Sequence, residues 1–163
     1  MRSKQNNRTL SIFTAIMCAL ILFSCYPKPI GPVGQDGKQL TWDMMSTDQR
    51  KMHMKTVVLP RAGELFRNWK PEKYSNPGCT LCHDNEITTG NFHMPGRHLP
   101  VLSGDWTLKP EFEKYPDTTR LKLDKLVPLM SEALGQKSFS IITKRGFGCY
   151  SCHMGPSGPM FGH

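Results

Sequence analysis

The sequence predicts a mainly α fold, a small domain of two helix–loop–Cys-x-x-Cys-His units joined by long irregular loops. The pentad Cys-x-x-Cys-His occurs twice, at 79–83 and at 149–153. Each pentad follows, after a loop, a run of apolar residues at helical spacing that contains a proline. The same order of segments in both halves favours an internal repeat.

The first 24 residues are typical of an export signal. Three basic residues open the chain, and an apolar run of about 14 residues follows over 10–23. This run is shorter than the roughly 20 residues that span a bilayer, which disfavours a retained transmembrane helix. It ends in Leu22-Phe23-Ser24-Cys25, which resembles a bacterial lipobox. The resemblance implies cleavage before Cys25 and a lipid anchor on its thiol.

The remaining chain has the size of one ordinary domain. Residues 25–39 are rich in Pro and Gly and lack an apolar period, so we expect a flexible tether there. Residues 40–163 then form the domain. Tyr26 stands in place of the aspartate that retains some lipoproteins at the inner membrane, which favours the outer membrane, with the domain facing the periplasm.

The first unit begins with the capping-box sequence Ser46-Thr47-Asp48-Gln49. A helix is predicted from Thr47 to Trp69, with Pro60 kinking it because proline removes a backbone donor and clashes with the preceding turn. Its apolar positions recur at helical spacing: Met54, Val58, Ala62, Leu65 and Trp69.

The second unit has the same order. Asp117 can cap a helix that Gly135 can end, and this helix also contains a proline, Pro128. Pro60 lies 19 residues before Cys79, and Pro128 lies 21 residues before Cys149. The predicted apolar face comprises Leu123, Leu126, Val127, Met130 and Leu134.

The segment 84–116 between the units is unusually long for a loop without structure of its own. It carries seven Gly and Pro residues and several aromatic side chains. Its aromatic residues can order it by packing over a large apolar cofactor, or it can be an ordinary surface loop.

The pentads predict two covalently bound haem c groups. In each, two thiols can form thioether bonds to haem vinyl groups, Cys79 with Cys82 and Cys149 with Cys152. The adjacent histidines, His83 and His153, would bind iron from the proximal side.

A zinc ribbon is the alternative, because two Cys-x-x-Cys pairs can hold one tetrahedral metal. Zinc does not require a histidine directly after each pair. Haem also accounts for every cysteine of an exported chain once Cys18 is removed and Cys25 carries lipid.

The order helix, loop, pentad, used twice, resembles one half of the tetrahaem cytochrome subunit of bacterial photosynthetic reaction centres. The resemblance rests on residues 47–83 and 117–153 and on the pentad context Gly148–His153, and it is loose elsewhere. It implies a dihaem c-type cytochrome with a distal methionine on the preceding helix. That position is Met130 in the second unit, but Ala62 in the first.

The distal ligand of the first haem therefore has two methionine candidates, Met94 and Met54. Met94 precedes Pro95 in the long loop, and Met54 lies on the predicted apolar face of the first helix. Any of these methionines can instead be ordinary core filler. Histidine alternatives are His93 and His98, followed by His53 and His163.

The net charge of +8 falls to +5 when three of the 21 basic residues leave with the signal, because the 13 acidic residues all remain. No basic run interleaved with aromatics stands out, so a nucleic-acid partner is not expected. The lysines can form a docking patch for an acidic redox protein or a plain solvated surface.

With a protein side chain on both faces of each iron, no substrate can bind the metal, and the expected function is electron transfer between periplasmic or membrane redox partners. The chain would then be an electron carrier rather than an enzyme, alone or as a subunit of a respiratory complex. The alternatives are a dihaem peroxidase-like enzyme and a haem-based sensor, both of which need an open iron site.

Overall fold

The computed structural model describes residues 26–160 except 84–86, 88–89 and 91. The predicted signal over 1–24, the predicted lipid anchor Cys25 and the histidine alternative His163 lie outside these residues.

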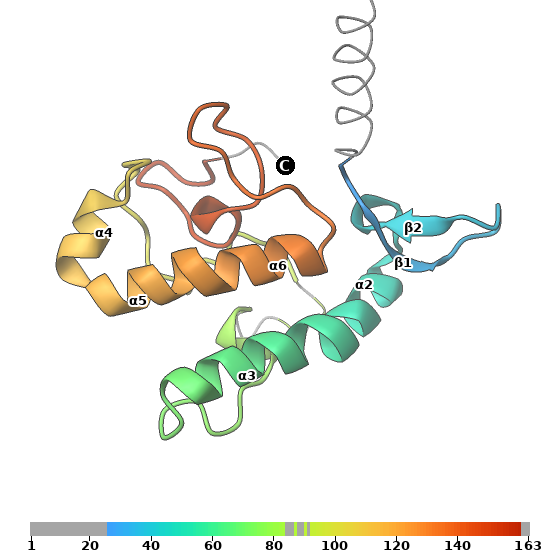
Figure 1. The fold of residues 1–163 in the computed structure, drawn as a ribbon, viewed down its shortest axis with the longest axis horizontal. Coiled ribbons are helices and arrows are strands. Elements are labelled where there is room, and N and C mark those ends of the chain that lie inside the picture. The colour runs from blue at the N-terminus through green and yellow to red at the C-terminus, as the bar shows by residue number, and fades with distance from the viewer. Residues whose placement is uncertain (1–25, 84–86, 88–89, 91, 161–163) are drawn as a thin grey trace, which may run out of the picture.

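The fold is mainly α, with one short two-stranded sheet. Two long helices run side by side in opposite directions (Figure 1). Each consists of two α-helical parts joined by a π-helical turn. The first comprises α2 (Thr47–His53), the turn Met54–Val58 and α3 (Leu59–Trp69), and the second comprises α5 (Pro116–Leu121), the turn Lys122–Leu126 and α6 (Val127–Ala133).

The first helix has the predicted bounds, from Thr47 to Trp69. Its capping box is formed: the Gln49 N–H donates to Ser46 Oγ at 3.3 Å, and the Ser46 N–H donates to Gln49 Oε1 at 2.8 Å. The box satisfies two backbone donors that the first turn leaves without partners.

The kink expected at Pro60 takes the form of the π turn before it. The Leu59 N–H bonds to Met54 O, five residues back, and the Val127 N–H bonds likewise to Lys122 O. A proline follows each of these donors, and a regular helix would press its ring against the carbonyl four residues earlier. The wider turn therefore accommodates the proline in both helices.

The second helix begins one residue before the predicted cap. Asp117 is not the N-cap but lies in the first turn of α5, where its charge still favours the positive end of the helix dipole. The predicted end at Gly135 is confirmed, with φ +61. The Gly135 and Gln136 N–H groups donate to Glu132 O at 3.0 Å and Ser131 O at 2.8 Å, which is a Schellman motif.

Leu123, predicted on the apolar face, is 37% exposed. It lies inside the π turn, which adds one residue to the helix and shifts the positions before it out of phase with those after it. Met130 and Leu134 lie beyond the turn, and both are buried.

The prediction of a flexible tether over 25–39 is wrong for the described residues. β1 (Pro29–Val33) pairs antiparallel with β2 (Gln39–Thr41), which follows it directly. Gly31 allows the strand to lie against Met45, because a Cβ there would stand 2.9 Å from the Met45 Sδ. The Lys28 N–H also donates to Gly135 O at 2.7 Å, which joins the hairpin to the end of α6.

The main core lies between the two long helices. The π turn of each helix contacts the α-helix that follows the π turn of the other. His53 Nε2 lies 2.7 Å from Ala133 O, and an Arg61–Glu132 ion pair of 3.2 Å joins α3 to α6. The buried core cluster is Val58, Met130, Ala133, Leu134 and Phe147.

The long loop is not structureless, since α4 (Lys109–Lys114) forms near its end. Among the helices of the described chain, none is both long and apolar enough to cross a bilayer.

Candidate functional site

The two Cys-x-x-Cys-His pentads have the same backbone structure. Each opens with a 3₁₀ turn, Cys79–Leu81 in the first and Cys149–Ser151 in the second. The His83 N–H donates to Cys79 O at 2.9 Å, and the His153 N–H donates to Cys149 O at 2.9 Å. The sequence repeat is therefore also a repeat of local geometry.

Each pentad is held against the helix that precedes it. In the first unit, Gly63 of α3 lets Pro77 approach, because a Cβ at Gly63 would stand 2.9 Å from Pro77 Cγ. In the second unit, Phe147 belongs to the core cluster with Met130 of α6. The residue two positions before the pentad makes the helix contact in both units.

The four pentad cysteines are not paired with one another. Cys79 is exposed, and the other three are partly buried. Burial raises the pKa of the Cys82 and Cys149 thiols and raises that of Cys152 to about 12, while the positive charge of Lys122 opposes all three shifts. The charge of Cys82 contributes to the raised pKa of Cys152, so the two pentads are neighbours in space.

His153 is held in a defined tautomer. Its side chain is 8% exposed, and its Nδ1 lies 2.8 Å from Pro100 O. A carbonyl oxygen only accepts, so Nδ1 carries the proton and Nε2 keeps its lone pair. Burial lowers the pKa of His153, which favours the neutral ring, although the hydrogen bond to Pro100 O opposes this shift. A neutral imidazole with one nitrogen fixed this way is the usual form of a metal-binding histidine.

His83 has a different environment. Its Nδ1 is buried and has no hydrogen-bond partner among the residues that the structure describes. The Phe92 ring packs edge-on against it at 5.9 Å. Burial lowers the pKa of His83, and the positive charge of His98 lowers it further.

A segment of the long loop, Pro95–Leu102, runs between the pentads, and we call it the bridging segment. The Gly96 N–H donates to Cys152 O at 3.1 Å, and the Leu102 N–H donates to Met154 O at 2.9 Å. A Cβ at Gly96 would also lie 3.6 Å from the carbonyl oxygen of Cys82. The segment thus touches both pentads and supplies the carbonyl that orients His153.

Sequence reasoning missed the bridging segment. Its hydrogen bonds to the second pentad come from the backbone of Gly96, Pro100 and Leu102, and backbone groups have no signature in a sequence. The only hint was the length of the loop, which is typical of a functional segment.

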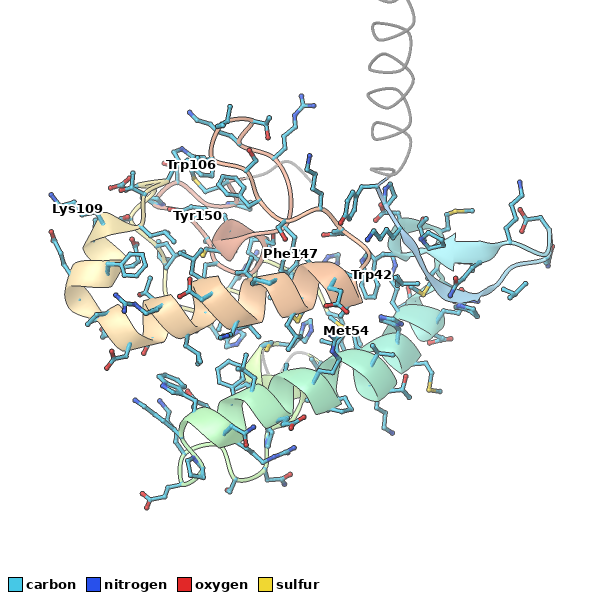
Figure 2. The ribbon with its side chains drawn as sticks, viewed as in Figure 1. Trp42, Met54, Trp106, Lys109, Phe147 and Tyr150 are labelled. Carbon is cyan, nitrogen blue, oxygen red and sulfur yellow. The ribbon has the colours of Figure 1, made fainter. Side chains whose placement is uncertain are left out.

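Two of the three candidate distal methionines meet in one place. Met130 belongs to the buried core cluster, and Met54 and Cys152 pack against that cluster. Figure 2 shows Met54 on the side of the first helix that faces the second. Met94 lies elsewhere, half-buried and two residues before Gly96 of the bridging segment.

The histidine alternatives are less well placed. His53 Nε2 contacts Ala133 O, and the His53 ring packs edge-on against Trp42. His93 and His98 are exposed.

Aromatic residues surround the second pentad. The Trp106 ring stacks on Phe139 at 5.5 Å and meets the Tyr150 ring edge-on at 5.1 Å (Figure 2). Gly148 leaves room for Phe139, since a Cβ there would stand 2.8 Å from the Phe139 Cβ. The Tyr150 hydroxyl is buried and, within the described part of the chain, has no well-formed hydrogen bond.

The donor atoms form two separate sets, each of two thiols and one imidazole. In the described chain, no group of three or more His, Cys, Asp or Glu side chains is arranged to hold a metal ion. Each set matches what covalent haem attachment uses, namely two thiols three positions apart and a histidine beside the second.

No family model matches this chain, and no curated protein or solved structure matches it either.

Proposed function

We propose that this chain is a membrane-tethered dihaem c-type cytochrome that transfers electrons between periplasmic or membrane redox partners. The observation that carries the proposal is the pair of Cys-x-x-Cys-His turns that share one backbone geometry and are both touched by the bridging segment. In this proposal the fold is a dihaem cytochrome c domain.

The residues present fit two haem groups. Cys79 with Cys82, and Cys149 with Cys152, would hold one group each through thioether bonds. His153 supports this assignment most directly, because its Nδ1–H is bound to Pro100 O and its Nε2 lone pair is free to bind iron. Bound haem would supply a one-electron iron couple in each unit.

The protein's own contribution would be to bury the pentads and to supply a further side chain that binds iron. Met130 is the candidate in the second unit, because it is buried in the cluster against which Cys152 packs. A thioether bound to iron there would leave no site for substrate, as an electron carrier requires. Met54 and Met94 remain the candidates for the first unit.

A lysine beside the pentads would affect the reduction of a haem bound there. Lys122, at the start of the second π turn, lies close enough to lower the pKa values of three pentad thiols. A fixed cation destabilises any nearby state of higher positive charge. We infer that Lys122 would favour the reduced state of a haem held by these cysteines.

The tether to the membrane rests on the sequence motif at Cys25. The lipid would hold the domain at the membrane, with the outer membrane favoured by Tyr26. The proposal is compatible with a free carrier and with a subunit of a respiratory complex.

The test is an optical spectrum of the protein made with haem-maturation machinery, recorded oxidised, and then reduced with and without carbon monoxide. We expect low-spin spectra, the methionine-to-iron charge-transfer band and no response to carbon monoxide. High-spin iron that binds carbon monoxide readily would instead support a peroxidase-like enzyme or a sensor. A colourless protein containing zinc would overturn the haem assignment.

A further inference from the structure

An exposed loop projects beyond the end of α6. This loop, Lys137–Gly146, which we call the basic loop, folds back on itself through pairings of Ser138 with Phe147 and of Ser140 with Arg145. Two isoleucines lie at its tip, Ile141 at 54% and Ile142 at 90% exposure. Adjacent exposed isoleucines have no role in the core or at the pentads, so they point to a surface contact.

The loop is also strongly basic. It contains Lys137, Lys144 and Arg145, all exposed, and the sequence has no Asp or Glu after Glu132. Lys137 and Arg145 line a shallow hollow together with Thr143 and Gly146. A bilayer has an apolar interior beneath anionic headgroups. A loop with isoleucines at its tip and basic side chains behind them matches that arrangement.

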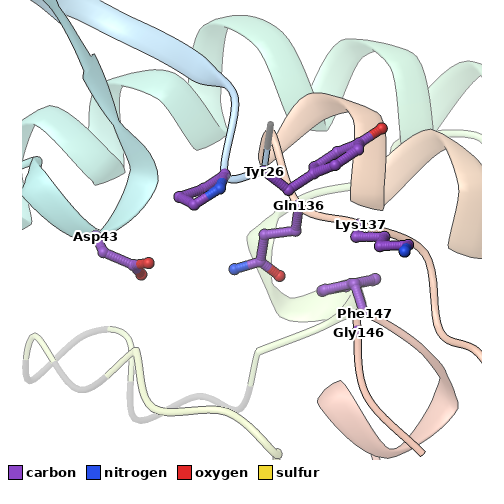
Figure 3. A pocket seen from close by; sticks show the side chains of 7 residues that line it. Tyr26, Asp43, Gln136, Lys137, Gly146 and Phe147 are labelled. Carbon is purple, nitrogen blue, oxygen red and sulfur yellow. The ribbon is translucent and has the colours of Figure 1, made fainter. Parts of the chain in front are cut away.

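The first residues that the structure describes lie beside the base of this loop. Tyr26, which directly follows the predicted lipid anchor in the sequence, lines a pocket together with Lys137 and Gly146 (Figure 3). The Lys28 N–H donates to Gly135 O just before the loop begins. Tyr26 and Lys28 are therefore held at the base of the basic loop.

We propose that the basic loop docks on the bilayer that carries the lipid of Cys25, with Ile141 and Ile142 in the interfacial region and the basic side chains at anionic lipid phosphates. This inference rests on the lipid anchor of the proposed function. Beside a lipid anchor, basic side chains add electrostatic attraction to anionic lipids and can fix which face of the domain meets the membrane.

Docking would also orient the domain. Phe139, inside the loop, stacks on Trp106, which contacts Tyr150 of the second pentad. A loop that rests on the membrane thus holds the second pentad near the membrane surface, while the far ends of α3 and α5 remain free for partners.

The test is amide hydrogen exchange. The whole chain is expressed in cells that process lipoproteins, and the purified product is reconstituted into vesicles. Vesicles of phosphatidylethanolamine with phosphatidylglycerol are compared with vesicles of phosphatidylcholine alone. Exchange over 138–146 should slow at least tenfold in the anionic vesicles, because the three basic side chains would together contribute more than the roughly 1.4 kcal/mol that corresponds to a factor of ten. Intact mass reports the acyl groups independently.

Two double variants test the residues. Ile141→Ser with Ile142→Ser, and Lys144→Gln with Arg145→Gln, should each remove most of the slowing. The matched controls are Met52→Ser, at an exposed apolar residue of α2, and Lys70→Gln with Lys73→Gln, beyond the end of α3. Both controls should leave the slowing of exchange unchanged.

The outcomes separate the two proposals. An acylated protein whose loop exchanges equally fast in both kinds of vesicle would overturn the docking surface and leave the loop to a protein partner. Slowed exchange in a protein whose mass shows no acyl group would overturn the lipid anchor on Cys25 and retain the basic loop as a membrane-docking surface. Neither acyl mass nor slowed exchange would overturn both.

Discussion

His153 Nδ1 lies 2.8 Å from the carbonyl oxygen of Pro100, a residue that belongs to the loop between the two units. This hydrogen bond sets the tautomer of a histidine in the second pentad from a segment that also bonds to Cys152 through Gly96. The bridging segment therefore links the loop after the first pentad to His153 and Cys152 of the second.

Replacing one pentad cysteine should remove one haem. Cys79→Ala or Cys149→Ala is expected to lower the haem content of the purified, denatured protein from two to about one, because each pentad attaches its own group. Haem is measured as the pyridine adduct against protein concentration. Cys18→Ala, in the predicted signal, is the control and should leave the ratio unchanged. Full haem content in both pentad variants would contradict the assignment.

Met130→Leu should open the sixth position of one iron. Leucine keeps the volume of the buried side chain, so the free energy of unfolding should change by less than about 1.5 kcal/mol. The loss of sulfur should weaken the methionine-to-iron band and allow carbon monoxide to bind. Met45→Leu is the matched control, because Met45 is buried against Gly31 in the hairpin region, and its variant should keep the band. An unchanged spectrum in Met130→Leu would make Met130 a packing residue.

The same substitution should act differently at the residue before each pentad. Gly148→Ala places a Cβ 2.8 Å from the Phe139 Cβ, whereas Gly78→Ala meets nothing within 4 Å. Displacing Phe139 disturbs its stacking on Trp106, so we expect Gly148→Ala to lower the free energy of unfolding by about 1–3 kcal/mol. Gly78→Ala should be nearly neutral. Chemical denaturation followed by circular dichroism measures both, and equal effects would show that Phe139 moves freely.

Tyr150→Phe should stabilise the protein against alkali. Burial raises the pKa of the Tyr150 phenol above its ordinary value near 10, so the folded state prefers the neutral form. The stability that this preference contributes is complete below pH 10 and is lost as the pH rises through the raised pKa of the folded state. Phenylalanine cannot ionise, so the variant should lose less stability than the wild type above pH 10.

Denaturation midpoints from pH 7 to 11 test this prediction. The gap between Tyr150→Phe and the wild type should widen above pH 10. Tyr115→Phe, at an exposed tyrosine, is the control. A gap that stays constant across the range would mean that Tyr150 ionises as easily in the folded as in the unfolded protein.

The parts of the fold that depend on local sequence could be predicted. The bounds of the first helix follow from the Ser46–Gln49 capping box and the end of the apolar period, and the end of α6 follows from Gly135. The pentads were equally clear, because their chemistry is contained in five consecutive residues.

The parts that depend on distant contacts could not be predicted. The hairpin over residues 29–41 looked like a tether because short strands rich in Pro and Gly gain their stability from contacts such as Lys28 with Gly135. The carbonyl of Pro100 and the meeting of Met54 with Met130 likewise exist only after the two helices have packed.

The π turns set which way the first part of each long helix faces. Each holds one residue more than a regular helical turn, and they lie at equivalent places before Pro60 and Pro128. Deleting one residue from a turn would rotate the preceding α-helix by about 100° relative to the α-helix that follows it. In the first helix this rotation would carry His53 away from Ala133 O, so the extra residue keeps α2 in register with the end of α6.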